Sequence, residues 1–266
     1  MPIFVGGYSR CGTTLMQGII CSDPRAFPVT KEASYFRGLV AAYDLGAGLW
    51  RSNTDDFFDS KEAYLGFHRE LIQAYLEHVR KRFGPDLEVV LKEPRLTCYF
   101  PRLLELVEGS RFIVMVRDPR DAIASQFVKI SKNHPRSPRL DARVLLGEYI
   151  EFYRAVLAAR AAFEDRLLFV RYEEFVTNPA PIMTGLRRVT GLALPIDPRS
   201  EGWETRRAPG QNTWTPLDGK PVASTSIGRY RQVLHDEALQ YIEKHRTQME
   251  DSFGFSVFVE NGSGVK

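Results

Sequence analysis

Four short apolar runs divide the chain and predict a buried sheet. They lie at residues 3–5, 89–91, 112–116 and 167–170, and none of them alternates strictly between apolar and polar positions. Strands of a parallel sheet show this pattern because helices cover both faces of the sheet. We therefore expect four parallel strands in the interior of an α/β protein.

Stretches with helical spacing of apolar residues separate these runs. The clearest spans residues 60–82, where aromatic and aliphatic side chains recur every three or four positions. Further helices are expected at residues 15–20, 101–107, 119–131, 141–165 and 179–190. This alternation predicts a single doubly wound α/β domain, with a central parallel sheet and helices on both faces.

We expect this domain to cover residues 1–260, with a flexible tail at 261–266. Residues 195–226 are rich in Pro, Gly, Thr and Trp, including Trp203 and Trp214. A connection of this length without helical or strand periodicity is typical of a functional loop. The segment is therefore predicted to be a lid or substrate loop.

Composition narrows the possible partners. The chain has 266 residues, 44% of them hydrophobic, and its net charge of +3 comes from basic residues spread along the sequence, so no nucleic-acid partner is expected. No apolar run approaches the roughly 20 residues of a membrane span, and the first strand leaves no room for a signal peptide, so we expect a cytoplasmic protein without an integral membrane segment. Three cysteines and five histidines show no metal-ligand spacing, so no metal is expected. The pattern predicts no particular oligomeric state.

The turn at residues 7–14, GYSRCGTT, follows the first apolar run and precedes a helix. Backbone N–H groups and the helix dipole favour an anion at such a turn. The lysine position of a nucleotide hydrolase holds Thr13 here, and Arg10 is the cation of the turn. A turn shaped only for close packing would explain the glycines, but Arg10, Thr13 and Thr14 favour a P-loop-like phosphate site.

Each remaining strand is also followed by a basic residue, namely Lys92, Arg117 or Arg171. Ligands of doubly wound sheets bind at the carboxyl ends of the strands. Arg117 and Ser125 lie eight residues apart across a strand-to-helix turn, so both can reach one phosphate. The alternative is an ion pair of Arg117 with Asp118 or Asp121.

Together these motifs resemble the sulfotransferases that use 3′-phosphoadenosine 5′-phosphosulfate (PAPS). Their Lys/Arg-Ser-Gly-Thr-Thr loop corresponds to residues 10–14, with Cys11 in place of Ser, and their Arg and Ser pair corresponds to Arg117 and Ser125. Weaker similarities are found at Tyr172, Ser226 and Arg229. The tyrosylprotein and bacterial carbohydrate or small-molecule branches are more similar than the phenol and steroid branch. That branch places a histidine base after its second strand, where this chain has Glu93-Pro94.

The resemblance implies roles for the residues of the site. The loop residues Cys11, Gly12, Thr13 and Thr14 would hold the 5′-phosphate, Arg117 and Ser125 the 3′-phosphate, and Tyr172, Ser226 and Arg229 would contact the nucleotide. Arg10 and Lys92 would meet the charge that develops on the leaving oxygen, with adenosine 3′,5′-bisphosphate as product and no metal. The acceptor would be a hydroxyl of a sugar, lipid, peptide tyrosine or natural product.

The acceptor hydroxyl needs a general base, and the resemblance favours Glu32. An ion pair between Glu32 and Lys31 is the alternative, and Glu93, beside Lys92, is the second candidate for the base. Glu93 in turn could simply pair with Lys92 or Arg95. Two other functions stay open, a P-loop-type kinase that lacks the usual lysine and a non-catalytic protein that binds adenosine 3′,5′-bisphosphate.

Overall fold

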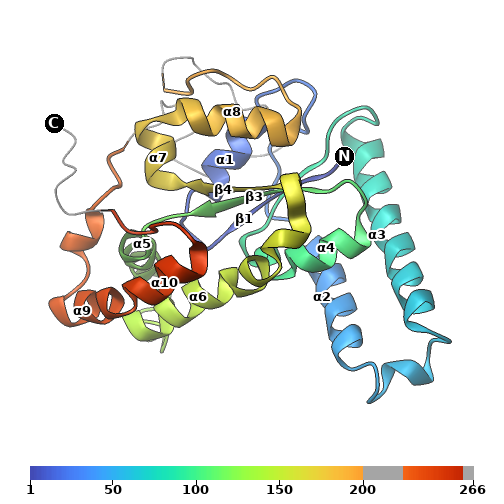
Figure 1. Cartoon of the computed structure of the whole chain (residues 1–266), viewed down its shortest axis with the longest axis horizontal. Coiled ribbons are helices and arrows are strands. Elements are labelled where there is room, and N and C mark those ends of the chain that lie inside the picture. Colours follow the sequence, from blue (N-terminus) through green and yellow to red (C-terminus); the bar gives the residue numbers. More distant parts are fainter. Residues whose placement is uncertain (200–223, 260–266) are drawn as a thin grey trace.

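A computed structural model of the chain describes residues 1–199 and 224–259. Its centre is a sheet of four parallel strands in the order β2-β1-β3-β4 (Figure 1). The strands are β1 (Ile3–Gly7), β2 (Val90–Lys92), β3 (Arg111–Val116) and β4 (Leu167–Arg171). Each strand overlaps one of the four apolar runs, so the predicted parallel sheet is confirmed.

Helices cover both faces of this sheet, which confirms the doubly wound α/β fold (Figure 1). One face carries α1 (Thr13–Ile20), α7 (Tyr172–Thr177) and α8 (Pro179–Thr190). The other carries α4 (Phe100–Leu106), α5 (Pro119–Asn133) and α6 (Ala142–Ala158), and α9 (Asp236–Lys244) and α10 (Arg246–Phe253) pack against α6. Short 3-10 helices are η1 (Thr54–Asp56), η2 (Pro94–Tyr99), η3 (Arg160–Arg166) and η4 (Arg229–Gln232).

Helices α2 (Ser34–Gly48) and α3 (Lys61–Phe83) lie side by side and extend away from the sheet (Figure 1). The helix expected at residues 60–82 is α3, and the Ser60 hydroxyl caps it by accepting a hydrogen bond from the N–H of Ala63. The pattern did not predict α2, because glycines interrupt its apolar positions. Only Phe36, Val40 and Tyr43 of α2 are buried.

Aromatic packing joins α2 to the sheet. The ring of Phe4, on β1, stacks between those of Phe36 and Phe112, with centroid distances of 5.6 and 5.7 Å. All three side chains are fully buried. Burial of large aromatic side chains is a main source of stability in a core. The packing of Phe36 against Phe4 therefore holds the first turn of α2 against the sheet.

Two further expectations meet the structure differently. The single helix predicted at residues 141–165 is wrong, since α6 ends at Ala158 and η3 follows, with Glu164 in a left-handed conformation at φ 54°. Residues 200–223 of the predicted lid, with Trp203 and Trp214, lie outside the described residues, as does the predicted tail. None of the described helices is long and apolar enough to cross a membrane.

Candidate functional site

The turn between β1 and α1 has a shape that few residues can adopt. Gly7 and Gly12 have φ values of 123° and 91°, and a Cβ on Gly7 would lie 2.2 Å from the backbone oxygen of Met115. Arg10 also has a positive φ of 75°, which is unfavourable for a residue with a side chain. Such strain persists where the surrounding structure imposes it, and it is frequent at ligand-binding sites.

This turn presents backbone donors at the start of α1. The N–H groups of Gly12, Thr13 and Thr14 donate no hydrogen bond within residues 1–199 and 224–259. The first N–H groups of a helix have no partner inside the helix, and the dipole makes that end positive. The turn therefore offers an anion site, as its sequence predicted.

Five of the residues named from the sequence converge beside this turn. The Arg10 Nε donates to Ser125 Oγ at 3.1 Å, and Arg117 donates to the backbone oxygens of Arg10, at 3.1 Å, and Ser226, at 2.6 Å. The hydroxyls of Ser226 and Tyr172 are hydrogen-bonded at 2.6 Å, and the Arg117 guanidinium lies 4.7 Å from the centre of the Tyr172 ring. The structure thus places two cations, Arg10 and Arg117, and three hydroxyl side chains around one loop.

The two arginines of this cluster lie close enough for their charges to interact, and the buried Asp121 and Glu173 lie near enough to Arg117 to act on it as well. Burial and the positive charge of Arg117 lower the pKa of Arg10. Neither side chain has an ion pair within the described part of the chain, and the buried Nε of Arg117 has no hydrogen-bond partner there. Positive charge gathered in this way favours an anionic ligand.

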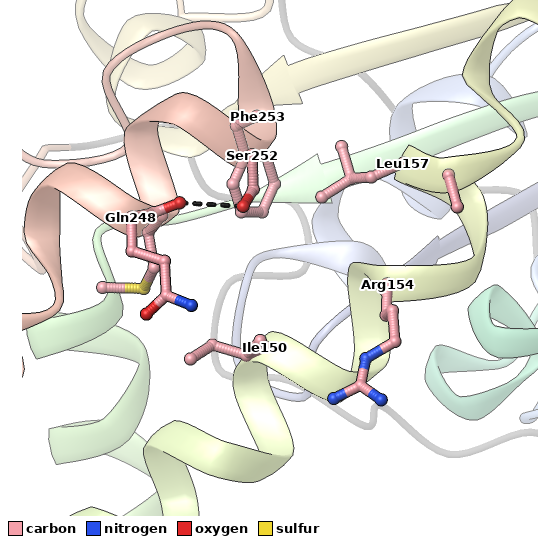
Figure 2. A pocket seen from close by; sticks show the side chains of 8 residues that line it. Ile150, Arg154, Leu157, Gln248, Ser252 and Phe253 are labelled. Carbon is pink, nitrogen blue, oxygen red and sulfur yellow. Dashed lines mark hydrogen bonds between the residues drawn. The ribbon is translucent and has the colours of Figure 1, made fainter.

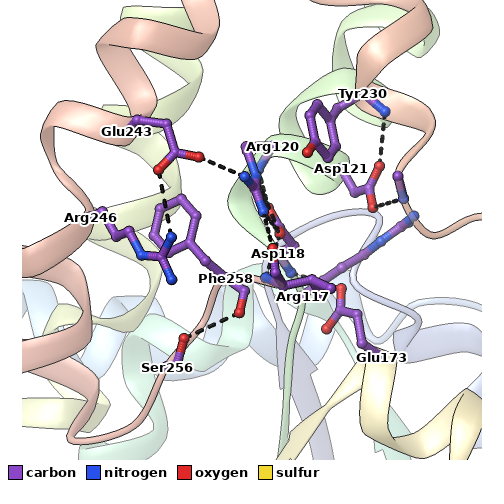
Figure 3. Close-up of polar contacts among 12 residues, drawn as sticks. Arg117, Asp118, Arg120, Asp121, Glu173, Tyr230, Glu243, Arg246, Ser256 and Phe258 are labelled. Carbon is purple, nitrogen blue, oxygen red and sulfur yellow. Dashed lines mark hydrogen bonds and ion pairs between the residues drawn. The ribbon is translucent and has the colours of Figure 1, made fainter. Parts of the chain in front are cut away.

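The alternative ion pair of Arg117 with a neighbouring aspartate is therefore wrong. Asp118 instead binds the buried guanidinium of Arg120 at 2.6 Å, and Arg120 also reaches Glu243 (Figure 3). Pairing is required here because an isolated buried charge would cost several kcal/mol. Asp118 and Arg120 therefore fix the turn after β3 and leave Arg117 available to the site.

Asp121 holds the C-terminal segment against the site. Its carboxylate accepts hydrogen bonds from the N–H groups of Gly228, at 2.7 Å, and Tyr230, at 2.9 Å (Figure 3). Burial raises the pKa of Asp121, and these two bonds offset part of that increase. This clamp brings Ser226 to Arg117.

The Arg229 side chain, expected near the nucleotide, is exposed at the start of η4 and has no hydrogen bond to the turn within the described residues.

Cys11 stands where the Lys/Arg-Ser-Gly-Thr-Thr loop that the turn resembles has serine, and its side chain is fully buried. The Tyr153 hydroxyl lies 3.6 Å from its sulfur and also accepts a hydrogen bond from the N–H of Tyr8. Burial raises the pKa of the Cys11 thiol to about 12. The thiol thus packs into the core beneath the turn, and only the backbone of this residue can face an anion.

At the end of β2, Lys92 forms an ion pair with Glu32. The Lys92 Nζ lies 2.9 Å from Glu32 Oε1, and the lysine side chain is 6% exposed against 52% for the glutamate. Glu93 is buried and accepts hydrogen bonds from the Ser34 hydroxyl, at 2.7 Å, and from the N–H of Arg95, at 3.1 Å. An ion pair of Glu93 with Lys92 or Arg95 is not found among the described residues.

A pocket of about 350 Å³ connects the turn with these two glutamates. Its lining is mostly polar and consists of Tyr8, Ser9, Glu32, Ser34, Arg37, Glu93, Pro94, Arg95, Gln126, Lys129, Arg139, Glu148 and Phe152. We call it the acceptor pocket, after the role proposed for it below. A second pocket, of about 400 Å³, lies between α6 and α10 beside Ile150 and Phe253 (Figure 2). None of the site residues named from the sequence lines that second pocket.

Sequence reasoning missed Glu173, which lies behind Arg117. This side chain is buried, accepts a hydrogen bond from the N–H of Asp118 at 2.9 Å and has a second oxygen without a partner among the described residues. Burial raises its pKa from 4.5 to about 7. Two adjacent glutamates normally indicate an exposed turn of helix, so the burial of Glu173 could not be predicted from this pattern.

Comparison with known proteins identifies the family. Residues 2–196 match the profile of the family described as "Sulfotransferase family". The chain therefore belongs to the sulfotransferase family. A "Putative protein-tyrosine sulfotransferase" of Caenorhabditis briggsae is 33% identical over 128 residues. That match covers 46% of this chain and 41% of the relative, so the two correspond over less than half of their lengths.

Two solved structures share the fold. The sulfotransferase domain of the Synechococcus PCC 7002 olefin synthase has a TM-score of 0.62 and 18% identity, over 96% of this chain and 94% of that domain. The sulfotransferase domain from the curacin biosynthetic pathway has a TM-score of 0.60 and 14% identity, over 97% and 99% of the two chains. At these identities the similarity establishes the architecture of the chain.

Proposed function

We propose that this protein transfers a sulfuryl group from PAPS to a hydroxyl of an acceptor. Family membership supports sulfuryl transfer, and one observation carries the choice of donor. Arg10, Ser125 and Arg117 form a second polar cluster beside the donors of the turn. Two groups of phosphate ligands side by side support a ligand with two separate phosphates.

The residues divide between the two phosphates. Thr13, Thr14 and the N–H groups of the turn would hold the 5′-phosphate, and Cys11 and Gly12 give the turn its shape. Arg117 and Ser125 would hold the 3′-phosphate. The nucleoside would lie near Tyr172, Ser226 and Arg229, as the family resemblance implies.

The reaction would be an in-line displacement at sulfur. Glu32 takes the proton of the acceptor hydroxyl, whose oxygen forms a bond to sulfur while the bond from sulfur to the bridging oxygen of the 5′-phosphate breaks. Adenosine 3′,5′-bisphosphate leaves with the electron pair of that bond. Arg10 and Lys92 stabilise the negative charge on the bridging oxygen.

The ion pair between Lys92 and Glu32 links these two events. A carboxylate that has accepted a proton no longer holds an ammonium group by charge. Proton transfer to Glu32 would therefore release Lys92 as the bridging oxygen becomes negative. No metal is required in this scheme, because the sulfuryl group carries one charge.

Ligand binding separates this function from a kinase. We expect adenosine 3′,5′-bisphosphate to raise the melting temperature equally with and without Mg²⁺, because it binds only the folded state. Stabilisation by ATP with Mg²⁺ but not by the bisphosphate would identify a kinase and refute the proposal. Stabilisation by the bisphosphate without radiolabel transfer from PAPS to any hydroxyl acceptor would indicate the non-catalytic binder.

Arg117 tests the second phosphate site. Arg117→Ala should weaken the bisphosphate at least about tenfold more than adenosine 5′-monophosphate, because only the bisphosphate has the 3′-group that the guanidinium binds. Isothermal titration calorimetry measures both affinities. Arg171→Ala is the matched control, since Arg171 also ends a strand but binds Glu174 and the Phe258 carbonyl. Equal weakening of both nucleotides by Arg117→Ala would remove it from this role.

A further inference from the structure

The carboxylates of the acceptor pocket already have partners within the protein. Glu148 makes two hydrogen bonds to the guanidinium of Arg139, at 2.7 and 2.5 Å. Glu32 is paired with Lys92, and Glu93 accepts from a hydroxyl and a backbone N–H. Glu32 and Glu148 are thus each balanced by a cation, and Glu93, which accepts only from neutral donors, leaves one negative charge against the remaining cations of the pocket.

Three cations of the same pocket have no such partner. Arg37 comes from α2, Arg95 from η2 and Lys129 from α5, and none of their side chains has an ion pair or hydrogen bond within the described residues. The Nε of Arg37 is enclosed, with less than 1 Å² exposed to solvent. The charge of the three side chains at the pocket wall indicates a ligand, because cations without a carboxylate partner favour an anion there.

Two neutral groups of the pocket show the same deficit. The Tyr8 hydroxyl and the Gln126 carbonyl oxygen are enclosed and have no hydrogen-bond partner in the described structure. The two side chains are only 1% and 6% exposed. Buried polar groups are nearly always hydrogen-bonded in folded proteins, so these two are exceptions behind the pocket wall, and it is the three cations that favour an anion.

From these observations we propose that the acceptor carries an anionic group, a carboxylate, phosphate or sulfate, in addition to its reacting hydroxyl. Arg37, Arg95 and Lys129 bind the anion, and the hydroxyl lies toward Glu32. A volume of about 350 Å³ is near the lower limit of ligand pockets and favours a small hydroxy acid or hydroxy phosphate. This inference rests on the proposed function, which supplies the hydroxyl.

Matched neutral and anionic compounds test the inference. Binding is measured by calorimetry with adenosine 3′,5′-bisphosphate at saturation, for para-hydroxyphenylacetate against its amide, lactate against lactamide, and glycerol phosphate against glycerol. We expect at least one anion to bind about tenfold or more tightly than its neutral partner, as charge-assisted hydrogen bonds require. Preference within the carboxylate pairs or within the phosphate pair identifies the anion.

Charge-removing variants locate the anion. Arg37→Gln and Arg95→Gln should each weaken the preferred anion about tenfold and leave its neutral partner and the bisphosphate unchanged. Lys129→Gln should likewise weaken the preferred anion, and Lys132→Gln, its control, should not, because Lys132 is exposed one turn further along α5 and does not line the pocket. The inference would be overturned if anions and their neutral partners bound equally, or if no anion bound. It would also be overturned if both arginine variants bound the preferred anion as tightly as the wild type. Anion binding without transfer from PAPS would instead refute the proposed function alone.

Discussion

At the scale of single residues, two glutamates of the acceptor pocket differ in what surrounds them. Glu32 is half exposed and touches Lys92, so its carboxylate can reach both solvent and a bound hydroxyl. Glu93 is buried and caps η2 by accepting from the N–H of Arg95. A group that already holds its own backbone is less available as a base, which supports Glu32 in that role.

Substitution of the two glutamates distinguishes their roles. Glu32→Gln should lower kcat about a hundredfold or more, since a positioned base contributes at least that much, and should leave bisphosphate binding intact. Glu93→Gln should reduce stability instead, because it weakens two buried hydrogen bonds. Steady-state sulfuryl transfer and urea unfolding measure the two effects. A loss of turnover confined to Glu93→Gln would transfer the role of base to Glu93.

Single residues also show how far the sequence predicts the arrangement of the candidate site. The family motif placed Arg10, Ser125, Arg117, Tyr172 and Ser226, and the structure brings all five together. The same motif left open what Cys11 does in place of the family serine, and the structure buries its thiol beneath the turn. A motif records which residues occur together, but the direction of a side chain depends on packing against distant segments such as α6.

At the scale of elements, the start of α1 fits against the start of α7. A Cβ on Gly12 would lie 2.7 Å from a ring carbon of Tyr172, and the φ of 91° is itself unfavourable for any other residue. The turn at residues 7–14 can therefore approach the Tyr172 ring only because Gly12 has no side chain.

Gly12→Ala should therefore reduce both stability and ligand binding. We expect a loss of about 2 kcal/mol in unfolding free energy, from backbone strain and displacement of Tyr172, together with weaker bisphosphate binding. Urea unfolding and calorimetry measure the two quantities. Gly38→Ala is the control, because a Cβ there meets nothing within 4 Å and alanine favours the α2 helix. Wild-type stability and affinity in Gly12→Ala would show that the close approach is not required.

Elements also differ in how well the sequence predicted them. The four strands were found because strands buried on both faces need uninterrupted apolar runs, a pattern that does not depend on the rest of the chain. Helix α2 was missed because its burial comes from a few contacts, such as Phe36 against Phe4, which only the folded chain creates. The acceptor pocket depends on α2, so Arg37 could not be assigned to it from the sequence.

At the scale of the whole molecule, Glu173 couples the site to stability. Its pKa is raised from 4.5 to about 7, so the unfolded chain ionises at lower pH than the folded protein. The folded state therefore loses stability as the pH rises through this window, and keeps its full contribution below pH 4.5. The loss is on the order of 3 kcal/mol.

Glu173→Gln should remove this dependence. The variant and the wild type should have similar unfolding free energies at low pH, and the variant should become the more stable as the pH rises to about 7. Urea unfolding across this range measures the difference. Glu174→Gln is the control, because Glu174 is exposed and paired with Arg171 at the surface. A difference between wild type and Glu173→Gln that does not change with pH would contradict the raised pKa.

The hydrogen bonds between the turn after β3 and residues 228–259 have a consequence for the order in which the structure forms during synthesis. Asp118 and Arg120 bind the backbone of Val259, and Asp121 holds Gly228, although the family profile ends at residue 196. A chain still being synthesised cannot complete these bonds until residue 259 has left the ribosome. Until then the turn after β3 lacks these hydrogen bonds, so the contacts that hold Ser226 beside Arg117 form only after residues far along the chain have been added.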